Sequence, residues 1–465
     1  MIKFQKSTYR RLPVLALVAV MCTGVYAQEK PARIDIDRAL EIALRSNHDY
    51  RLAVKRQRAA KEKVNAAWGM LYPALGSGAS MVRQDAENGF MSLSDGQYDI
   101  QIVQLAFGIN PGGFYNSLQL SRKNYTAVTQ DLRRVRNEIT HSVIKSYFSV
   151  LLAEEMISLR RDTLKLLREN LKDVQNLYKT GSVPRFELLQ AEVRVKSQES
   201  LLLEAENDFR VALSFFNYHL GSDSGLYSVD RGILDNRKYR EPGQDIQEAC
   251  SRLTQKALAN RPEVVQVRLK KEIAAHRKGL QRSLYLWPTF SVGGYYGMTK
   301  YMPNSVNVGV PGVDFSGITG TDEWQKTWQV RVAATYRWGA LLPVDRARAG
   351  VREEKIRMQE AEEELERLRK LIMIRIRSSY SGLVTASHTI RTRMDNVETA
   401  EEGLRIARES YRAGVIKNSE LLGAHVALTE AKTGYIHSVN SYYLSLAGLK
   451  KEIGTDDDSI IFGGK

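Results

Sequence analysis

The chain lacks the features that mark several classes of protein. It has only two cysteines, Cys22 and Cys250, in 465 residues. Its seven histidines are scattered, without an H-E-x-x-H motif or a Cys/His cluster, and no Gly-rich phosphate loop is present. We therefore expect no metal, no cofactor and no catalytic residues, which argues against an enzyme.

Long hydrophobic runs are also absent. Leu12 to Met21 is an apolar stretch, but it is too short to span a bilayer, which needs roughly 20 residues. Basic residues precede it and Val25-Tyr26-Ala27 follows it, so residues 1–27 are predicted to be a signal peptide cleaved after Ala27. No later stretch reaches about 18 consecutive apolar residues. An exported chain of this kind is soluble, lipid-anchored (Cys22 would be the anchor) or a β-barrel.

The net charge is strongly positive but is not patterned for nucleic acid. The formal charge is +15, and removing Lys3, Lys6, Arg10 and Arg11 with the signal peptide leaves 15 − 4 = +11. The remaining Lys and Arg alternate with Glu, as in Arg352 to Lys370. That pattern is typical of solvated helix faces, so we expect no nucleic-acid partner. With Cys22 removed as well, no intrachain disulfide is possible.

Proline is missing from two long tracts. None lies between Pro111 and Pro184, and none follows Pro343. Apolar residues recur every three or four positions in both tracts, which predicts helices over Phe114 to Thr180 and Val344 to Ala413. Each helix would be about 100 Å long. Glycine suits the left-handed residue that ends a helix, and the predicted ends are Gly181 and Gly414. Returning helices are predicted over Phe186 to Leu220 and Ser419 to Leu449.

The two tracts belong to a tandem duplication. Tyr178 and Gly181 reappear as Tyr411 and Gly414, at an offset of 411 − 178 = 233 residues, which also relates Gly221 to Gly454. A constant offset indicates a repeated structural unit. Shorter helical regions open the two repeats, Ile36 to Leu71, with a turn at Asn47-His48-Asp49, and Ile246 to Leu286, broken at Pro262. The predicted organisation after the signal peptide is a first repeat (28–221), a linker (222–245), a second repeat (246–454) and a tail (455–465).

A different periodicity precedes the second long helix. Apolar side chains alternate with mostly polar ones from Trp328 to Trp338, which predicts a strand. Aromatic ends and an apolar middle are typical of a lipid-facing membrane strand, although a soluble hairpin is the alternative. Weaker strands are predicted at Phe290 to Met298, Ala74 to Arg83 and Tyr98 to Phe107. Four strands cannot close a barrel, so several chains would have to share one. The predicted lipid-facing residues are Trp328, Val330, Val332, Ala334, Tyr336 and Trp338.

At this point the sequence resembles the TolC-like outer-membrane efflux proteins. The resemblance rests on the signal peptide, the two repeats of helix, strand pair and long helical hairpin, and the doubled turn. The turn sequences are Tyr178-Lys179-Thr180-Gly181 followed by Leu188-Leu189-Gln190-Ala191, and Tyr411-Arg412-Ala413-Gly414 followed by Leu421-Leu422-Gly423-Ala424. The resemblance covers nearly the whole chain after the signal peptide.

The resemblance implies a mainly α fold with a membrane β part. Three copies would form an α-barrel in the periplasm and a shared 12-stranded β-barrel in the outer membrane of a Gram-negative cell, with four strands from each chain. It further implies a passive channel of a tripartite efflux or type I secretion system. The implied partners are two further copies, a periplasmic adaptor, an inner-membrane RND or ABC transporter and outer-membrane lipid. The alternative function is a periplasmic coiled-coil scaffold or adaptor without a pore.

The resemblance also implies roles for residues at the two turns. Tyr178, Gly181, Tyr411 and Gly414 would lie at the periplasmic tip where an adaptor docks. Glu420 matches an acidic constriction residue, while the second expected acid is here Gly423. Tyr411 and Glu187 match the two members of a gating link, but Ile416 stands where the family has an arginine. Glu187 and Glu420 are therefore candidate gate residues, and each could equally be an ordinary acid at a helix start.

Overall fold

The computed structural model describes residues 32–83, 94–222, 227–230, 240–243, 245–303, 323–338, 344–455 and 459–462. The predicted signal peptide and Cys22 lie outside these residues. The described helices are α1 (Ile36–Ser46), α2 (His48–Gly69), α3 (Pro111–Lys179), α4 (Arg185–Leu220), α6 (Ile246–Asn260), α7 (Pro262–Leu286), α8 (Arg346–Arg412), α9 (Asn418–Ile453) and α10 (Ser459–Phe462). The strands are β1 (Ala32–Ile34), β2 (Ala74–Arg83), β3 (Ser94–Ile109), β4 (Tyr227–Val229), β5 (Thr289–Pro303) and β6 (Gln325–Thr335).

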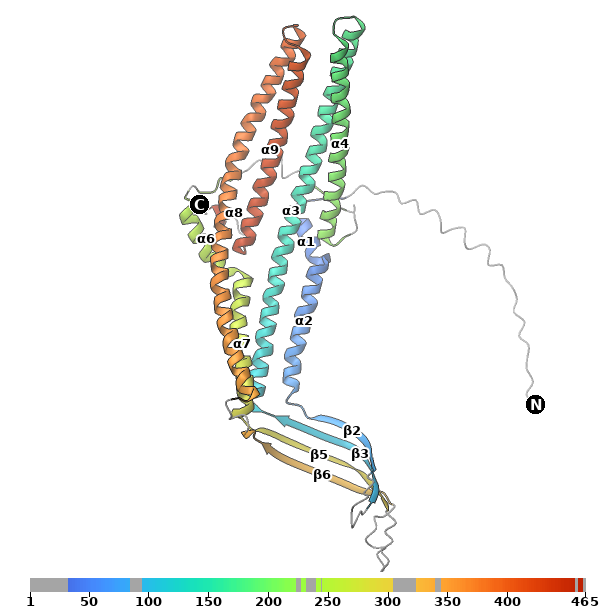
Figure 1. Ribbon diagram of the computed structural model, residues 1–465, viewed down its shortest axis with the longest axis vertical. Helices are drawn as coiled ribbons and strands as arrows, with labels where there is room; N and C mark the ends of the chain where they lie inside the picture. Colours follow the sequence, from blue (N-terminus) through green and yellow to red (C-terminus); the bar gives the residue numbers. More distant parts are fainter. Residues whose placement is uncertain are drawn as a thin grey trace, which may run out of the picture.

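The molecule is a long helical rod with a sheet at one end and two hairpin tips at the other (Figure 1). The four-stranded sheet has the order β2-β3-β5-β6, and every neighbouring pair is antiparallel. The helices that connect to these strands pack in the same order, α2 on α3, α3 on α7 and α7 on α8. One layer of helices therefore continues one layer of sheet.

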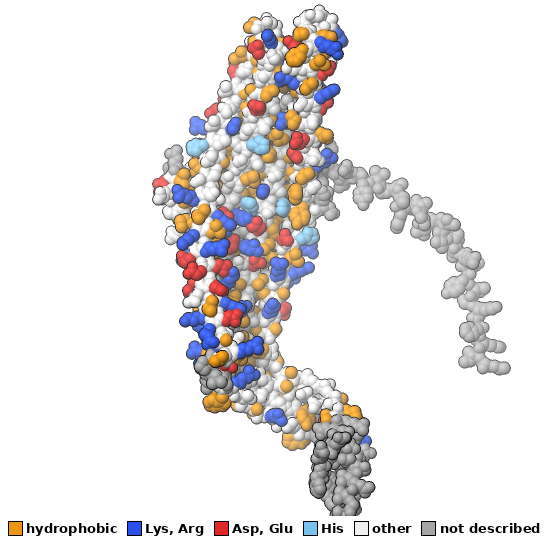
Figure 2. All heavy atoms as spheres, in the orientation of Figure 1, with side chains coloured by type: hydrophobic (Ala, Val, Ile, Leu, Met, Phe, Trp, Pro, Cys, Tyr) orange, Lys and Arg blue, Asp and Glu red, His pale blue; other side chains and the backbone are white. Residues whose placement is uncertain are grey.

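The half of the rod farther from the sheet is built from the two helical hairpins. α4 packs along α3, α9 packs along α8, and α3 contacts α9 between the hairpins. Among the described helices, only α3 and α8 run through both halves, with 69 and 67 residues. Lys and Arg side chains occur together with Asp and Glu along much of the rod (Figure 2). The two long helices and both hairpins predicted from the proline-free tracts are confirmed.

Local sequence explains where the long helices begin and end. α3 starts three residues before the predicted Phe114, because the Asn110 side chain accepts a hydrogen bond from the Gly113 amide at 2.7 Å and Pro111 occupies the first turn. The Asp345 side chain caps α8 in the same way. At the far ends, Gly181 and Gly414 both have φ of +74°, as the left-handed termination requires.

The returning helices end against the short ones. The C-terminus of α4 meets the junction between α1 and α2, where Asn47 donates to the His219 carbonyl at 2.8 Å. In the second repeat, Arg261 between α6 and α7 donates to the Glu452 carbonyl at 3.3 Å. A Cβ on Gly221, whose φ is +73°, would lie 2.5 Å from a backbone oxygen of α1. These docked ends connect the two halves of the rod.

Replacing Asn47 by alanine is expected to lower the free energy of unfolding by about 2 kcal/mol. The buried Asn47 side chain accepts from the Asp49 and Tyr50 amides as the cap of α2, and its loss also removes the donor to His219. Urea denaturation followed by helical circular dichroism measures the change. Asn65→Ala is the matched control, since Asn65 bonds only the nearby Glu62 on the same helix. Equal stability of the two variants would contradict the role given to Asn47.

The two repeats have corresponding cores near the middle of the rod. Tyr147 of α3 and Tyr380 of α8 are 380 − 147 = 233 residues apart, and both rings are buried. Their hydroxyls donate to the Asp230 and Gly243 carbonyls at 2.8 Å each, so both bind the segment that joins the repeats. Phe148 stacks on Tyr443 of α9 at 4.4 Å and joins the two cores.

Three small elements were not predicted. β1 pairs in parallel with β4, and α10 packs against α6. Strands of three residues and a helix of four are too short to give a periodic signal. Within the described ranges, no helix is both long and apolar enough to cross a membrane.

Candidate functional site

One face of the sheet is apolar and open to the surroundings. The ladder places Val332 beside Val292 and Trp328 beside Tyr296, with Phe107 next to Val292 on β3. Trp328 is 73% and Val332 75% exposed in the single chain. Such a continuous exposed apolar surface indicates contact with something other than water. The exposed apolar residues on this face include Leu75, Val103, Phe290, Val292, Tyr296, Trp328, Val330 and Val332.

The opposite face of the sheet is more polar. β5 presents Ser291, Gly293, Tyr295, Gly297 and Thr299 there, and Arg331 of β6 lies beside Gly293. The Thr299 hydroxyl donates to Asp99 at 2.7 Å and lies 3.2 Å from the Thr327 hydroxyl. The two faces thus differ as expected for a strand layer between lipid and water.

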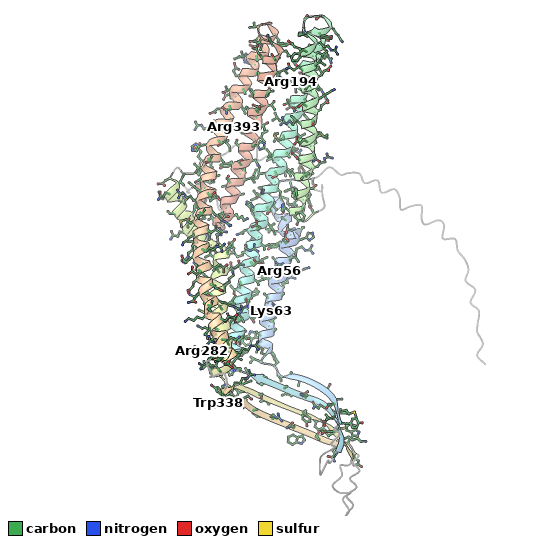
Figure 3. The ribbon with its side chains drawn as sticks, in the orientation of Figure 1. Arg56, Lys63, Arg194, Arg282, Trp338 and Arg393 are labelled. Carbon is green, nitrogen blue, oxygen red and sulfur yellow. The ribbon has the colours of Figure 1, made fainter. Side chains whose placement is uncertain are left out.

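The predicted boundaries of the last strand were wrong by three residues at each end. The strand spans Gln325–Thr335 instead of Trp328 to Trp338, so Tyr336 and Trp338 follow it. The ladder ends where Thr335 pairs with Thr289, because the residue before Thr289 is Pro288, which has no amide proton to donate. Trp338 lies at the helical end of the sheet (Figure 3). Trp328, Val330, Val332 and Ala334 remain on the strand as predicted.

The two hairpin tips have the same geometry. The Gly181 amide donates to the Tyr178 carbonyl, and the Ser182 amide donates to Leu177 at 2.8 Å. The Gly414 amide likewise donates to Tyr411, and the next amide donates five residues back at 2.9 Å. Nothing lies within 4 Å of a Cβ built on either glycine, so the left-handed backbone alone requires glycine there. Both turns are exposed, which leaves them accessible to a partner.

Tyr411 and Glu187 come from different hairpins and lie close enough to interact electrostatically. Partial burial raises the pKa of Tyr411, and the charges of Asp173 and Glu187 raise it further. The phenol therefore stays protonated at neutral pH and can act as a donor. Glu187 and Glu420 occupy the first turns of α4 and α9, where the helix dipole favours a carboxylate. Glu187 is partly buried, whereas Glu420 is exposed.

Sequence reasoning missed a buried polar pair between the hairpins. The Asn170 amide of α3 donates to the Asn418 side-chain oxygen of α9 at 2.6 Å, and the two residues are 7% and 6% exposed. The hydroxyls of Thr163 and Thr429 face each other at 3.3 Å nearer the middle of the rod. The sequence did contain an indication of a buried polar contact here. Asn170 is a polar residue within the apolar repeat formed by Leu164, Leu167, Leu171 and Val174.

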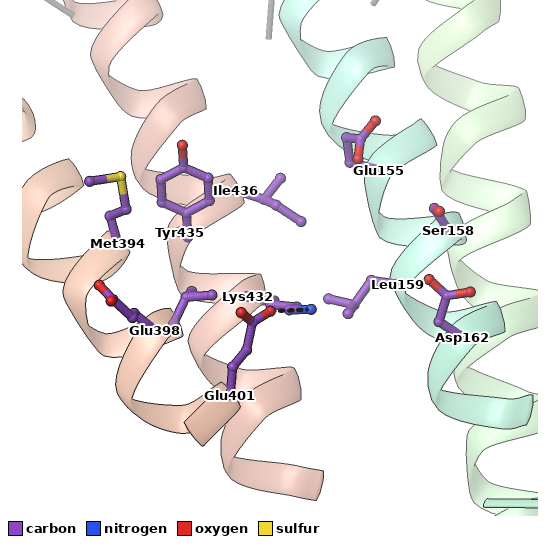
Figure 4. Close-up of a pocket in the computed structure, with 11 residues that line it drawn as sticks. Glu155, Ser158, Leu159, Asp162, Met394, Glu398, Glu401, Lys432, Tyr435 and Ile436 are labelled. Atoms are coloured by element: carbon purple, nitrogen blue, oxygen red, sulfur yellow. Dashed lines mark ion pairs between the residues drawn. The ribbon is translucent and has the colours of Figure 1, made fainter. Parts of the chain in front are cut away.

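A pocket lies between α3 on one side and α8 and α9 on the other, with a volume of about 600 Å³. Glu155 and Asp162 face it from α3 (Figure 4). On the opposite wall Lys432 pairs with Glu401 at 2.9 Å. The lining is acidic and open, and no group of three or more metal-ligating side chains occurs among the described residues. This arrangement indicates a solvated gap between the two hairpins.

The sequence matches a known protein family and two named relatives. Residues 39–214 and 253–455 match the family described as Outer membrane efflux protein. The chain is 22% identical over 427 residues to the alkaline protease secretion protein AprF of Pseudomonas aeruginosa, covering 90% of this chain and 84% of AprF. It is 26% identical over 199 residues to the probable outer membrane lipoprotein SilC of Salmonella typhimurium, and that match spans only 42% of SilC and 43% of this chain.

A solved structure shows the same fold. The Campylobacter jejuni CmeC outer membrane channel superposes with a TM-score of 0.70 at 17% identity, over 91% of this chain and 87% of that one. The expected combination of long helical hairpins and a small β part is therefore confirmed.

Proposed function

The chain belongs to the outer membrane efflux protein family, and from that premise we propose that three copies form one passive duct for export across a Gram-negative outer membrane. The exposed apolar face of the sheet is the observation that carries this proposal. Such a face is stable next to lipid chains and unfavourable next to water. The polar face, with Arg331, would then line the pore.

The edges of the sheet support an assembly of several copies. β2 and β6 are the two edges, so each has backbone groups without a partner in the single chain. A bilayer does not tolerate an open edge, since its core offers no hydrogen bonds. β6 of one copy can pair with β2 of the next, and three copies would close a ring of twelve strands. The helices continue the strands in the same order, so the ring would extend into a helical tube.

The tips define the partners that we propose. Exposed turns at Tyr178, Gly181, Tyr411 and Gly414 would dock a periplasmic adaptor that leads to an inner-membrane RND or ABC transporter. The duct itself would perform no reaction, and the transporter would supply the energy. Both efflux and protein secretion fit such a duct, because a wide polar passage selects mainly by size and charge.

The tip end would also hold the gate. Tyr411 and Glu187 lie across the two hairpins, and the Asn170–Asn418 pair joins the same hairpins within the protein. Opening would separate α9 from α3 at the tip. The stacked Phe148 and Tyr443 would keep the hairpins together near the middle of the rod.

Reconstitution tests the proposed duct. Full-length protein extracted from membranes should migrate as a trimer on a native gel and should form water-filled channels in a planar bilayer. A detergent-free soluble monomer would overturn the proposal and would favour the scaffold without a pore.

Glu420→Gln should lower the preference of the channel for cations by about fivefold. A unit charge about 4 Å from a passing ion in water is worth about 1 kcal/mol, and this variant removes one carboxylate from each copy at the tip. The reversal potential in a salt gradient across a planar bilayer measures the preference. Glu62→Gln on α2 removes the same charge far from the tip and should change it little. Equal effects of the two variants would contradict a constriction at Glu420.

A further inference from the structure

Basic side chains gather where the helices meet the sheet. Arg277, Lys278 and Arg282 lie near the end of α7, and no acidic residue occurs between Ile273 and Leu286. The first turns of α8 add Arg346, Arg348 and Arg352, again without an acid among them. We name these six residues the basic collar. Blue side chains are visible over this end of the rod in Figure 2.

The same two helices carry balanced charge farther from the sheet. Lys270 pairs with Glu364 at 2.7 Å, and Lys271 pairs with Glu362 at 2.6 Å. Arg357 pairs with two glutamates on its own helix. The excess of basic over acidic residues in these two helices therefore lies at the end next to the sheet.

The collar lies near the end of the sheet. Arg282 precedes the last residue of α7 by four positions, about 6 Å along the helix axis, and Lys278 by eight positions, about 12 Å. Arg282 appears beside the junction between the helices and the sheet (Figure 3). A long basic side chain can extend its charged group farther still while its methylene stem covers apolar surface.

Aromatic side chains link the collar to the apolar face. Tyr336 continues the alternation of that face, and its hydroxyl donates to the Tyr285 carbonyl at 2.6 Å. The guanidinium of Arg348 lies 5.8 Å from the centre of the Tyr285 ring. Trp338 packs edge-on against Tyr336 at 4.9 Å. Aromatic residues with basic neighbours at the end of an apolar face are typical of the level of lipid headgroups.

We propose that the basic collar binds the phosphate headgroups of anionic phospholipids in the leaflet that borders the helical rod. This inference rests on the proposed placement of the sheet in a membrane. Each basic residue near an anionic surface contributes about fivefold in affinity, so several per copy give a marked preference for anionic over zwitterionic lipid. The collar would fix the depth of the sheet, because the charges would hold the helix ends at the headgroups.

Native mass spectrometry of the detergent-solubilised trimer, incubated with equal amounts of phosphatidylglycerol and phosphatidylcholine, tests the proposal. The wild-type protein should retain phosphatidylglycerol in clear excess. Arg282→Gln combined with Arg348→Gln should reduce that excess by about twentyfold. Arg56→Gln combined with Arg194→Gln removes the same charge farther from the sheet and should leave the excess unchanged (Figure 3).

Two results would overturn the collar while leaving the duct intact. One is an unchanged excess of phosphatidylglycerol in the collar variant. The other is binding to purified peptidoglycan that depends on the collar, with no preference among the two phospholipids. Failure of the wild-type protein to form trimers or channels in either lipid would instead contradict the proposed duct, so the two failures are distinguishable.

Discussion

Arginine in place of Val332 is expected to prevent the chain from assembling in a membrane. Val332 lies on β6 beside Val292, both on the apolar face, and its side chain is 75% exposed. A cation on the lipid side of a membrane strand costs about 2–4 kcal/mol at the bilayer midplane. Three copies in one ring would carry about three times that cost, a large fraction of the stability of a folded protein.

The matched control is Gln329→Arg on the same strand. Gln329 is three positions away, on the polar face that we assign to the pore, so its replacement introduces the same charge without lipid contact. The amount of trimer in the outer-membrane fraction measures both variants. Val332→Arg should abolish it and Gln329→Arg should retain most of it. Normal assembly of Val332→Arg would mean that the apolar face does not contact lipid, which is the outcome the scaffold alternative predicts.

The long helices could be predicted because their signals are local and repeated. Proline-free tracts, apolar spacing and the terminal glycines Gly181 and Gly414 all depend on residues close in the sequence. The position of Pro262 likewise marked the start of α7. The end of β6 could not be predicted in this way, because it is set by its partner. Alternation continues through Tyr336, but the ladder stops opposite Pro288, a residue nearly fifty positions earlier.

The contact between the hairpins illustrates a second limit. Asn170 and Asn418 are 248 positions apart, and the 233-residue offset does not relate them. The repeat predicts that the hairpins resemble each other, but it does not predict how one packs on the other. The gate residues taken from the resemblance stay predictions as well. Tyr411 and Glu187 do lie within electrostatic reach of each other, whereas nothing in a single chain places Glu420 on a constriction.

Replacing Asn170 by alanine is expected to raise the ratio of open to closed channels by about tenfold. In the closed arrangement the Asn418 side chain is buried and would lose its partner, which costs about 1–3 kcal/mol. Separation of the hairpins exposes Asn418 to water, so the open arrangement does not bear that cost. A difference of about 1.4 kcal/mol shifts the equilibrium tenfold. Single-channel recording in planar bilayers measures the open fraction directly.

A double-mutant cycle separates a specific pair from general loosening of the helices. Asn170→Ala and Asn418→Ala should each promote opening, and the double variant should open no more than either single one, because the first change already breaks the pair. Thr399→Ala is the control, since its hydroxyl bonds only to the Asp395 carbonyl of its own helix. Additive effects, or an unchanged open fraction in variants that still form trimers, would show that the pair does not hold the hairpins closed. If the effects are not additive, the coupling energy from the cycle measures how strongly this pair joins the two repeats near the tip.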